Sequence, residues 1–332
     1  MSNVHFILGM GRSGTTLLLS MFNSIENNFC IPEIPSAMYL YNSHRNRISF
    51  STGDAQKILT LKNKIQYIRA IKIDEKFFLK RTTQCKSYRE FVETTYLSVL
   101  NPEKERNNIQ NIIDKNPIYT FYSDDLLNIF PDAKFILMVR QPHSYVNSCL
   151  ESIDPGKKRR SSAFYSFTYR LYAKEIMRIN KRYQNQSLII HYEDLVSTPE
   201  NTLKSICKHL QIQYDPEMLE FYKKPNNFKE NKDGINEAQR TRIKYKYGAL
   251  SNPVNTHRIE SWKEKLSQKD IDMISSITHF ESEKLGYFFP KVNKRISVNF
   301  ILSAITVKLY FLFARNFYYT PIWLREIFRI RV

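Results

Sequence analysis

Cysteine is scarce in this sequence and is never clustered. The 332 residues contain four cysteines, which lie far apart and form no C-x-x-C pair: Cys30, Cys85, Cys149 and Cys207. This spacing argues against a disulfide framework and offers no cysteine zinc site. We expect four buried free thiols.

Acidic residues are also in deficit. Aspartate and glutamate number 32 against 50 lysines and arginines, which gives a formal charge of +18. Such a charge points to an acidic cofactor, an acidic acceptor or an anionic membrane surface. Nucleic acid would fit as well, but the chain has no zinc-ligand spacing, helix-turn-helix pattern or aromatic RNA-binding signature. We therefore expect no nucleic-acid partner.

No secretion signal, linker or internal repeat is visible along the chain. The first apolar run starts at Val4 without a basic segment before it and leads directly into a glycine-rich turn, which indicates a first strand and not a signal peptide. With 42% hydrophobic residues the chain can bury a large core. We expect a cytoplasmic protein with one domain over 1–290 and a basic, partly apolar extension over 291–332.

Apolar runs and helical patterns alternate along the first 290 residues. Strands or strand-to-loop units are predicted at 4–9, 28–36, 109–117, 134–139 and 187–191. Helical spacing predicts insertion helices over 55–81 and 86–100, and further helices over 124–130, 163–183, 199–210 and 267–285. This alternation favours an α/β fold with a P-loop-like parallel sheet flanked by helices, and ligands at the carboxyl ends of the strands.

The stretch from Val4 to Ser24 joins an apolar run, a glycine-rich turn and a second apolar periodic segment. Gly9, Gly11 and Gly14 allow the backbone to approach a ligand closely. The helix that follows points its free N–H groups and the positive end of its dipole into the turn. The pattern of strand, phosphate loop and helix predicts an anion site.

Two families offer a partial match to this loop. The G-x-G-x-x-G spacing fits the dinucleotide fingerprint, in which Glu33 would be the acid that binds the ribose, but Glu33 lies between two prolines. The spacing Gly9-x4-Gly14 also resembles the P-loop of nucleotide kinases, but Thr15 stands where that motif has its phosphate-binding lysine.

A third family accounts for every residue of the loop. Gly-Arg-Ser-Gly-Thr-Thr-Leu at 11–17 resembles the 5′-phosphosulfate loop of sulfotransferases that use 3′-phosphoadenylyl sulfate (PAPS). Other segments resemble motifs of that family in the family's order: Asp114-Lys115-Asn116-Pro117, Val139-Arg140 with Ser148, Tyr192-Glu193-Asp194-Leu195, and Pro253-Val254-Asn255 with Trp262. Each motif alone is weak, but five in order are specific. The 21 positions from Arg12 to Glu33 are similar to the branch of tyrosylprotein and bacterial carbohydrate sulfotransferases.

This resemblance implies a binding site for PAPS. Arg12 would hold the sulfonate, and donors to the 5′-phosphate would come from Gly11, Ser13, Gly14, Thr15 and Thr16. The 3′-phosphate would be held by Arg140 and Ser148. Tyr192 would contact adenine, and Ser251 would belong to the loop that closes over the nucleotide.

The resemblance also implies a catalytic set of Glu33, Arg12 and Lys115, and no metal. Glu33 would take the proton from the acceptor hydroxyl, and Lys115 would approach the sulfuryl group. Small-molecule sulfotransferases have a histidine base where this chain has Pro117, so the chain departs from that branch. We expect His143 and His191 to be structural.

The expected reaction is sulfuryl transfer from PAPS to a hydroxyl acceptor. The basic clusters at 157–160 and 240–246 favour an acidic or surface-associated acceptor, such as a polysaccharide, a glycolipid or a peptide tyrosine. Two alternative functions remain, a P-loop-type nucleotide kinase and a catalytically inactive, membrane-associated PAP-binding module.

The extension over 291–332 has two interpretations. A lysine inside its apolar run over 296–313 argues against a membrane-spanning helix. The extension forms either a helix pair that packs on the domain or a basic amphipathic surface that contacts the inner face of an anionic membrane.

Overall fold

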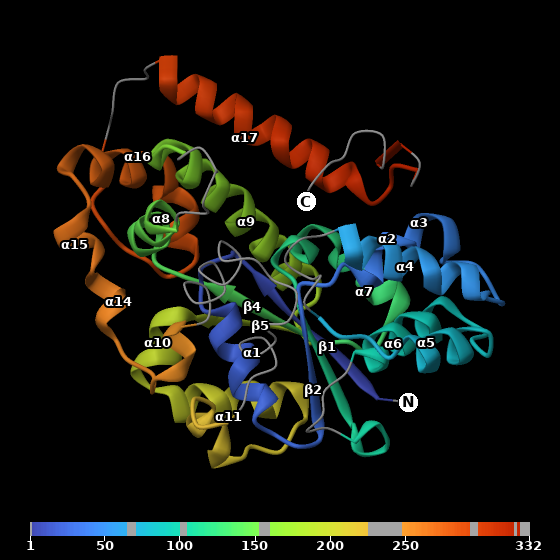
Figure 1. Cartoon of the computed structure of the whole chain (residues 1–332). Coiled ribbons are helices and arrows are strands. Elements are labelled where there is room, and N and C mark those ends of the chain that lie inside the picture. Colours follow the sequence, from blue (N-terminus) through green and yellow to red (C-terminus); the bar gives the residue numbers. More distant parts are fainter. Residues whose placement is uncertain are drawn as a thin grey trace.

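The chain folds around a five-stranded sheet in a computed structural model, which describes residues 2–64, 71–99, 105–152, 160–224, 248–292, 298–321 and 324–325. The strands lie in the order β2-β3-β1-β4-β5, and every neighbouring pair is parallel (Figure 1). Their bounds are β1 (Asn3–Gly9), β2 (Asn28–Pro32), β3 (Asn111–Lys115), β4 (Phe135–Val139) and β5 (Ser187–His191). The predicted strands and parallel sheet are confirmed.

The direction of the chain connections reverses at the middle of the sheet. β1 lies between β3 and β4, and the chain leaves β1 toward β2 on one side but leaves β4 toward β5 on the other. Connections that diverge in this way open a crevice at the carboxyl ends of the two central strands. Gly9, at the end of β1, is paired with Met138 of β4 at that point.

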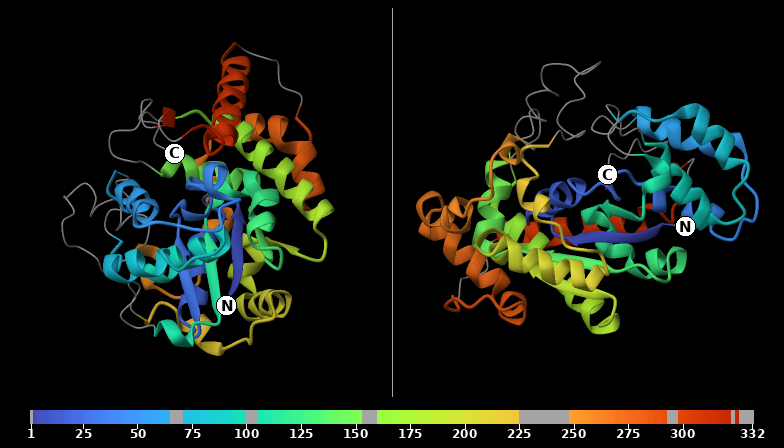
Figure 2. Two further views of the ribbon diagram at one scale, coloured as in Figure 1. Left: turned by 90° about the vertical axis from the view of Figure 1, so that its right-hand side faces the viewer. Right: turned by 90° about the horizontal axis from the view of Figure 1, so that it is seen from below.

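Helices cover both faces of the sheet (Figures 1 and 2). Each face of the sheet has its own hydrophobic core. Because side chains alternate along a strand, Phe6 of β1 belongs to one core and Ile7 to the other. The face of Ile7 is covered by α1 (Thr15–Asn23), α11 (Pro199–Leu210) and η3 (Pro216–Glu220). The face of Phe6 is covered by η2 (Pro117–Tyr122), α7 (Ser123–Ile129) and α9 (Ser162–Arg182). All four cysteines are buried free thiols, as predicted.

The segment between β2 and β3 is a helical insertion, as predicted. Its elements are α2 (Ser36–Tyr39), α3 (Tyr41–His44), α4 (Thr52–Lys64), α5 (Glu75–Thr82), α6 (Tyr88–Ser98) and η1 (Arg106–Asn108). The predicted helix over 55–81 is therefore two helices among the described residues. Asp74 caps α5 by accepting from the Phe77 amide at 3.0 Å, so a new helix begins there.

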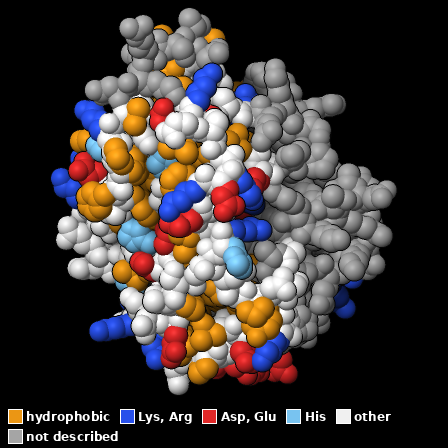
Figure 3. Space-filling view, turned by 90° about the vertical axis from the view of Figure 1, so that its left-hand side faces the viewer, with side chains coloured by type: hydrophobic (Ala, Val, Ile, Leu, Met, Phe, Trp, Pro, Cys, Tyr) orange, Lys and Arg blue, Asp and Glu red, His pale blue; other side chains and the backbone are white. Residues whose placement is uncertain are grey.

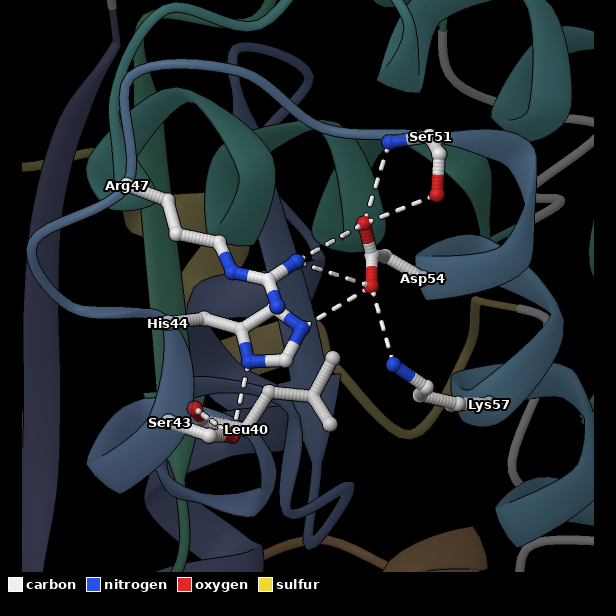
Figure 4. A network of polar contacts seen from close by, with 7 residues as sticks. All are labelled: Leu40, Ser43, His44, Arg47, Ser51, Asp54 and Lys57. Carbon is white, nitrogen blue, oxygen red and sulfur yellow. Dashed lines mark hydrogen bonds and ion pairs between the residues drawn. The ribbon is translucent and has the colours of Figure 1, made fainter.

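Within this insertion, a buried carboxylate joins α3 to the start of α4 (Figure 4). Asp54 accepts hydrogen bonds from His44 Nε2 at 2.9 Å, from Lys57 Nζ at 3.0 Å, and from the amide and hydroxyl of Ser51, each at 3.0 Å. The bond from the Ser51 amide is one half of a capping box, in which the third residue of α4 satisfies the amide just before the helix. Burial alone would raise the pKa of Asp54, but these donors outweigh it and hold that pKa below its usual range.

The remaining helices surround the carboxyl ends of β4 and β5. They are α8 (Pro142–Glu151), α10 (Tyr192–Ser197), η4 (Gly248–Ser251), α14 (His257–Glu260), α15 (Trp262–Lys265) and α16 (Gln268–Lys284). Gly286, with φ of 84°, follows the end of α16, as the sequence predicts. The basic cluster at 240–246 lies outside the described residues. Of the basic cluster at 157–160, only Arg160 is described.

Helix α17 (Val298–Phe317) lies along α9 on the outside of the molecule (Figure 1). Its Phe311 ring contacts Phe121 and Tyr172 at centroid distances of 4.9 and 5.5 Å. The Tyr122 hydroxyl also donates a hydrogen bond to the Ala314 carbonyl. The described part of the 291–332 extension is thus joined to the domain core.

Two buried histidines make the stability of this fold depend on pH. Burial lowers the pKa of His5, in β1, and of His143, in α8, from 6.5 to about 4. Between these values the unfolded chain binds more protons than the folded one. The stabilisation is therefore complete above pH 6.5 and is lost as the pH falls, by up to about 3 kcal/mol per histidine.

Urea unfolding followed by tryptophan fluorescence across this pH window measures the effect. His5→Asn should flatten the pH dependence, because asparagine does not titrate in this pH range. Its side-chain oxygen can still accept the hydrogen bond from the Lys134 amide that His5 Nδ1 accepts, so the local structure should be kept. His257→Gln, at an exposed position, is the control. An unchanged slope in a variant that lacks both buried histidines would contradict the prediction.

Candidate functional site

A cavity of about 320 Å³ lies at the carboxyl ends of the central strands. This volume is typical of a small-molecule site. Nine of the predicted site residues line the cavity: Gly11, Arg12, Gly14, Thr15, Thr16, Glu33, Arg140, Ser148 and Tyr192. Residues far apart in the sequence therefore meet in one place. Ser13, Lys115 and Ser251 are the predicted residues that do not line it.

The glycine-rich turn has a left-handed backbone at three positions. Gly9, Arg12 and Gly14 have φ values of 114°, 68° and 85°. A side chain on Gly14 would place a Cβ 2.7 Å from Cδ2 of Tyr192, so a glycine is needed there for packing as well as for conformation. Ser13 turns its hydroxyl away from the cavity and donates to the Met10 carbonyl at 2.5 Å. This contact occupies the hydroxyl of Ser13, so the backbone amide is the Ser13 donor that remains for a ligand.

Helix α1 begins directly at this turn. Gly14 is the N-cap and supplies no side chain to bond the first amides of the helix. Thr15 and Thr16, the first two helical residues, line the cavity. A helix N-terminus that opens into a cavity attracts anions, since its amides and dipole present positive charge there.

Arg140 is a buried cation, and among the described residues its hydrogen-bond partners are carbonyls and a hydroxyl but no carboxylate. Its Nη1 donates to the Arg12 carbonyl at 3.0 Å, and its Nη2 donates to Ser144 Oγ at 3.2 Å and to the Arg258 carbonyl at 2.7 Å. The guanidinium lies 4.2 Å from the Tyr192 ring centroid. Its Nε is buried with no hydrogen-bond partner among the described residues. Burial lowers the pKa of Arg140, so an anion in the cavity would relieve the desolvation of this charge.

Arg12 and Ser148 meet across the cavity mouth. Arg12 Nε donates to Ser148 Oγ at 3.3 Å, which links the glycine-rich turn to α8. The sequence assigned these two residues to opposite ends of the nucleotide. In the structure they are direct neighbours.

Glu33 and Lys115 form an ion pair at the ends of β2 and β3. Pro32 is paired with Lys115 across the two strands, and the Glu33 amide donates to the Lys115 carbonyl at 2.9 Å. Lys115 Nζ donates to Glu33 Oε1. The Lys115 side chain is 1% exposed and the Glu33 side chain 25%. Glu33 lines the cavity, whereas the Lys115 side chain is buried, does not line the cavity and contacts Glu33.

The segment at 250–258 forms the outer wall of the cavity. Leu250, Asn252, Asn255 and Arg258 line it, together with the Pro253 and Val254 of the predicted loop. Ser251 itself is exposed and is not a lining residue. Neighbours of Ser251 in the predicted loop therefore line the cavity, and Ser251 does not.

Ser144 supports the site although no motif in the sequence pointed to it. Its hydroxyl lies 2.9 Å from the Arg258 carbonyl and 2.8 Å from the Ile259 carbonyl, so it holds the outer wall against α8. Its position four residues after Arg140, in the first turn of the predicted helix, was the available signal.

Residues around Tyr192 brace the cavity from behind. Glu193 accepts hydrogen bonds from the Gln141 amide at 3.0 Å and the Tyr287 hydroxyl at 2.8 Å. His143 stacks on Trp262 at a centroid distance of 4.6 Å, and His191 Nε2 lies 2.7 Å from the Leu285 carbonyl. Both histidines hold segments together, as predicted.

The charges around the cavity favour an anionic ligand. Three arginines, Arg12, Arg140 and Arg258, line it against one acid, Glu33. A helix N-terminus and a buried guanidinium meet there. The arrangement can bind phosphate or sulfonate groups and place a carboxylate base beside them.

Comparison with known proteins agrees with this chemistry. A sequence model of the sulfotransferase family matches residues 5–216 of this chain. A protein-tyrosine sulfotransferase of Drosophila melanogaster is 24% identical over 162 residues, which are 46% of this chain and 30% of the relative. The omega-hydroxy-beta-dihydromenaquinone-9 sulfotransferase Stf3 of Mycobacterium bovis is 24% identical over 160 residues, 42% of this chain and 40% of the relative. Putative protein-tyrosine sulfotransferases of Caenorhabditis briggsae and Caenorhabditis elegans also match, and the match spans at most 62% of the length of any of these four relatives.

Two solved structures share the fold. The sulfotransferase domain of the Synechococcus PCC 7002 olefin synthase is 19% identical with a TM-score of 0.56, and the match covers 87% of this chain and 96% of that one. The sulfotransferase domain from the curacin biosynthetic pathway is 20% identical with a TM-score of 0.58, over 87% of this chain and 99% of that one.

Proposed function

Because the chain belongs to the sulfotransferase family, we propose that it moves a sulfuryl group from PAPS to a hydroxyl acceptor by in-line displacement. One observation carries this proposal. A glycine-rich turn, a buried arginine without a carboxylate partner among the described residues, and a cavity-facing glutamate meet in one cavity. This combination suits a donor with anionic groups at both ends and an acceptor that must lose a proton.

The residues present fit PAPS at both of its charged ends. The amides at the start of α1, with Thr15 and Thr16, suit the 5′-phosphosulfate. The Nε of Arg140, which has no hydrogen-bond partner in the part of the chain that the structure describes, suits the 3′-phosphate. Arg12 and Ser148, which touch each other, lie between these two regions of the wall. PAPS supplies an activated sulfuryl group, and the chain's task is to position it and neutralise its charge.

Glu33 is the proposed base and Lys115 its positioning residue. Glu33 is the one acid among the described residues that line the cavity. It would take the proton from the acceptor hydroxyl as the oxygen attacks sulfur, while the nucleotide leaves with the electrons of the broken S–O bond. Lys115 holds one carboxylate oxygen, which fixes the direction of the other.

The acceptor is proposed to be a phenol or an alcohol on a larger molecule. The names of two relatives, a protein-tyrosine sulfotransferase and a menaquinone sulfotransferase, give one peptide and one lipid hydroxyl. A carboxylate base can serve either. The surplus of basic residues favours an acidic or surface-associated acceptor, such as a polysaccharide, a glycolipid or a peptide tyrosine, in the cytoplasm.

The proposal is tested by incubation of the full chain with 35S-labelled PAPS and an array of peptide, saccharide and lipid acceptors. Transfer of label to one acceptor class is expected. Binding of Mg-ATP that excess PAP does not displace would instead indicate a kinase, although no lysine is among the described lining residues. Tight PAP binding with no transfer to any acceptor would indicate an inactive binding module.

Arg140→Lys is expected to weaken the binding of PAP by roughly 10- to 100-fold, because a lysine cannot make the several directed contacts of the guanidinium. Isothermal titration calorimetry measures this, with a thermal melt to verify folding. Arg182→Lys, an exposed replacement on α9, is the control. Undiminished affinity in folded Arg140→Lys would remove Arg140 from the proposed site.

A further inference from the structure

The outer side of α17 exposes a continuous apolar surface. Six side chains on it are each between 43% and 61% exposed: Ile301, Leu302, Ile305, Leu309, Leu312 and Phe313. Their spacing of one, three or four positions places them on one side of the helix. We call these six residues the outer face of α17. Exposed apolar clusters of this kind mark interaction surfaces.

The opposite side of α17 is used for packing. Val307, Phe311, Ala314 and Phe317 are buried and follow the same helical period half a turn away. Helix α17 is therefore apolar on both sides, and the packing on α9 accounts for one of them. The sequence left two interpretations of this segment, packing on the domain and contact with a membrane. The two are compatible, because each would involve a different side of the helix.

The charges around the outer face are basic. Lys308 and Arg315 are exposed and follow Ile305 and Leu312 by three positions, which places both along one edge of the face. The sequence has no aspartate or glutamate between Glu283 and Glu326. On the side formed by α14–α16, in contrast, acidic side chains lie among lysines and arginines (Figure 3).

We infer that the outer face of α17 docks the protein on an anionic lipid bilayer. An amphipathic surface with apolar residues at its centre and lysine or arginine at its edge binds such an interface, since lipid headgroups supply the negative charge and the acyl region takes the apolar side chains. A second copy of the chain fits less well. A symmetric contact through this face would bring like charges together on a chain of formal charge +18.

Helix α17 would lie on the bilayer and not cross it. By length and composition alone the helix could span, since Phe300–Phe317 has a mean hydropathy of 1.4. Contacts along its length hold it against the domain, however: Phe300 contacts Phe167 near its start, and Phe311 contacts Tyr172 further along. Beyond its end, the Tyr319 carbonyl accepts a hydrogen bond from Asn42 at 2.8 Å. A helix held in this way presents only its outer face.

Co-sedimentation of the full chain with vesicles of phosphatidylcholine and phosphatidylglycerol tests the inference. Binding is expected to these vesicles, to be weaker with phosphatidylcholine alone, and to fall as salt is raised. The triple variant Ile305→Gln, Leu309→Gln, Leu312→Gln should bind at least about tenfold more weakly, because it removes apolar side chains from the centre of the face. Ile48→Gln, at an exposed apolar residue that is not on α17, is the matched control.

A second variant keeps the test decisive if the triple variant is less stable. Lys308→Gln with Arg315→Gln should reduce binding to the anionic vesicles and weaken its salt dependence, with little effect on phosphatidylcholine vesicles. The inference would be overturned if the unaltered chain did not bind the vesicles. It would also be overturned if both variants bound them as strongly as the unaltered chain does. Sedimentation of the chain as a dimer that the triple variant abolishes would overturn it as well. These readouts require no sulfuryl transfer, so they stand apart from the proposed reaction.

Discussion

Glu33→Gln is expected to lower kcat for sulfuryl transfer by about 10²–10⁴-fold, the range that a positioned base contributes. Glutamine has nearly the same shape, and its amide oxygen can still accept the hydrogen bond from Lys115 Nζ that Glu33 accepts. The local geometry should therefore survive while the ability to take the acceptor proton is lost. Initial rates of 35S transfer from PAPS at saturating acceptor measure kcat.

The affinity for PAP separates this effect from general damage to the site. It should change little in Glu33→Gln, because a carboxylate does not attract the nucleotide's negative groups. Glu220→Gln, which replaces an acid in an exposed ion pair with Lys223, is the control for loss of one negative charge. A kcat within a few-fold of the unaltered chain would exclude Glu33 as the base.

Lys115 gives a complementary measurement at the same ion pair. In Lys115→Met the long side chain is kept and the Nζ donor is lost, so the Glu33 carboxylate loses its fixed orientation. A positioning role predicts a fall in kcat for Lys115→Met and no further fall when Glu33→Gln is added, since the two act as one unit. Independent, multiplying losses would mean that Lys115 contacts the sulfuryl group itself.

Gly9→Ala is expected to reduce the free energy of unfolding by roughly 2–6 kcal/mol. The backbone at Gly9 has φ of 114°, which L side chains rarely adopt, and a Cβ there would lie 2.2 Å from the Met138 carbonyl oxygen. The conformational strain and the steric clash each cost about 1–3 kcal/mol. The obstructing atom belongs to the backbone of β4, so relief requires the two central strands to separate.

Gly11→Ala is the matched control for Gly9→Ala. It lies two positions away in the same turn, its φ is not positive, and a Cβ added to it would meet nothing within 4 Å. Its free energy of unfolding should stay within about 0.5 kcal/mol of the unaltered chain. Urea denaturation of both variants measures the difference. Equal stability of the two would show that the ends of β1 and β4 can rearrange at little cost.

The strands and their order along the chain were readable from the sequence because buried parallel strands are short, continuous apolar runs. The run at 134–139 ending in Arg140 is the clearest case. The insertion helices were readable in kind but not in number, because the cap of α5 at Asp74 resembles an ordinary polar residue in the sequence.

The site residues differ in how far the sequence could place them. Gly11, Gly14, Thr15 and Thr16 line the cavity because the conformation of one short loop fixes them all. Ser13 lies in the same loop, but its hydroxyl bonds to the Met10 carbonyl, and the residue pattern does not show the direction of a side chain in an irregular turn. Ser251 is a related case, since its loop lines the cavity through neighbouring residues.

The sequence by itself determined the strand-turn-helix pattern, and it predicted an anion site at the turn and a glutamate 21 positions after the loop arginine, because each depends on local conformation or on a recurring motif. Only the tertiary structure decided which side chains touch. It placed Arg12 against Ser148, set Lys115 behind Glu33, and left Arg140 buried between the turn and the outer wall of the cavity. It also showed α17 to be apolar on two sides. Such contacts join residues 82 to 136 positions apart, and their geometry follows from the packing of the sheet and its helices, which no local pattern specifies.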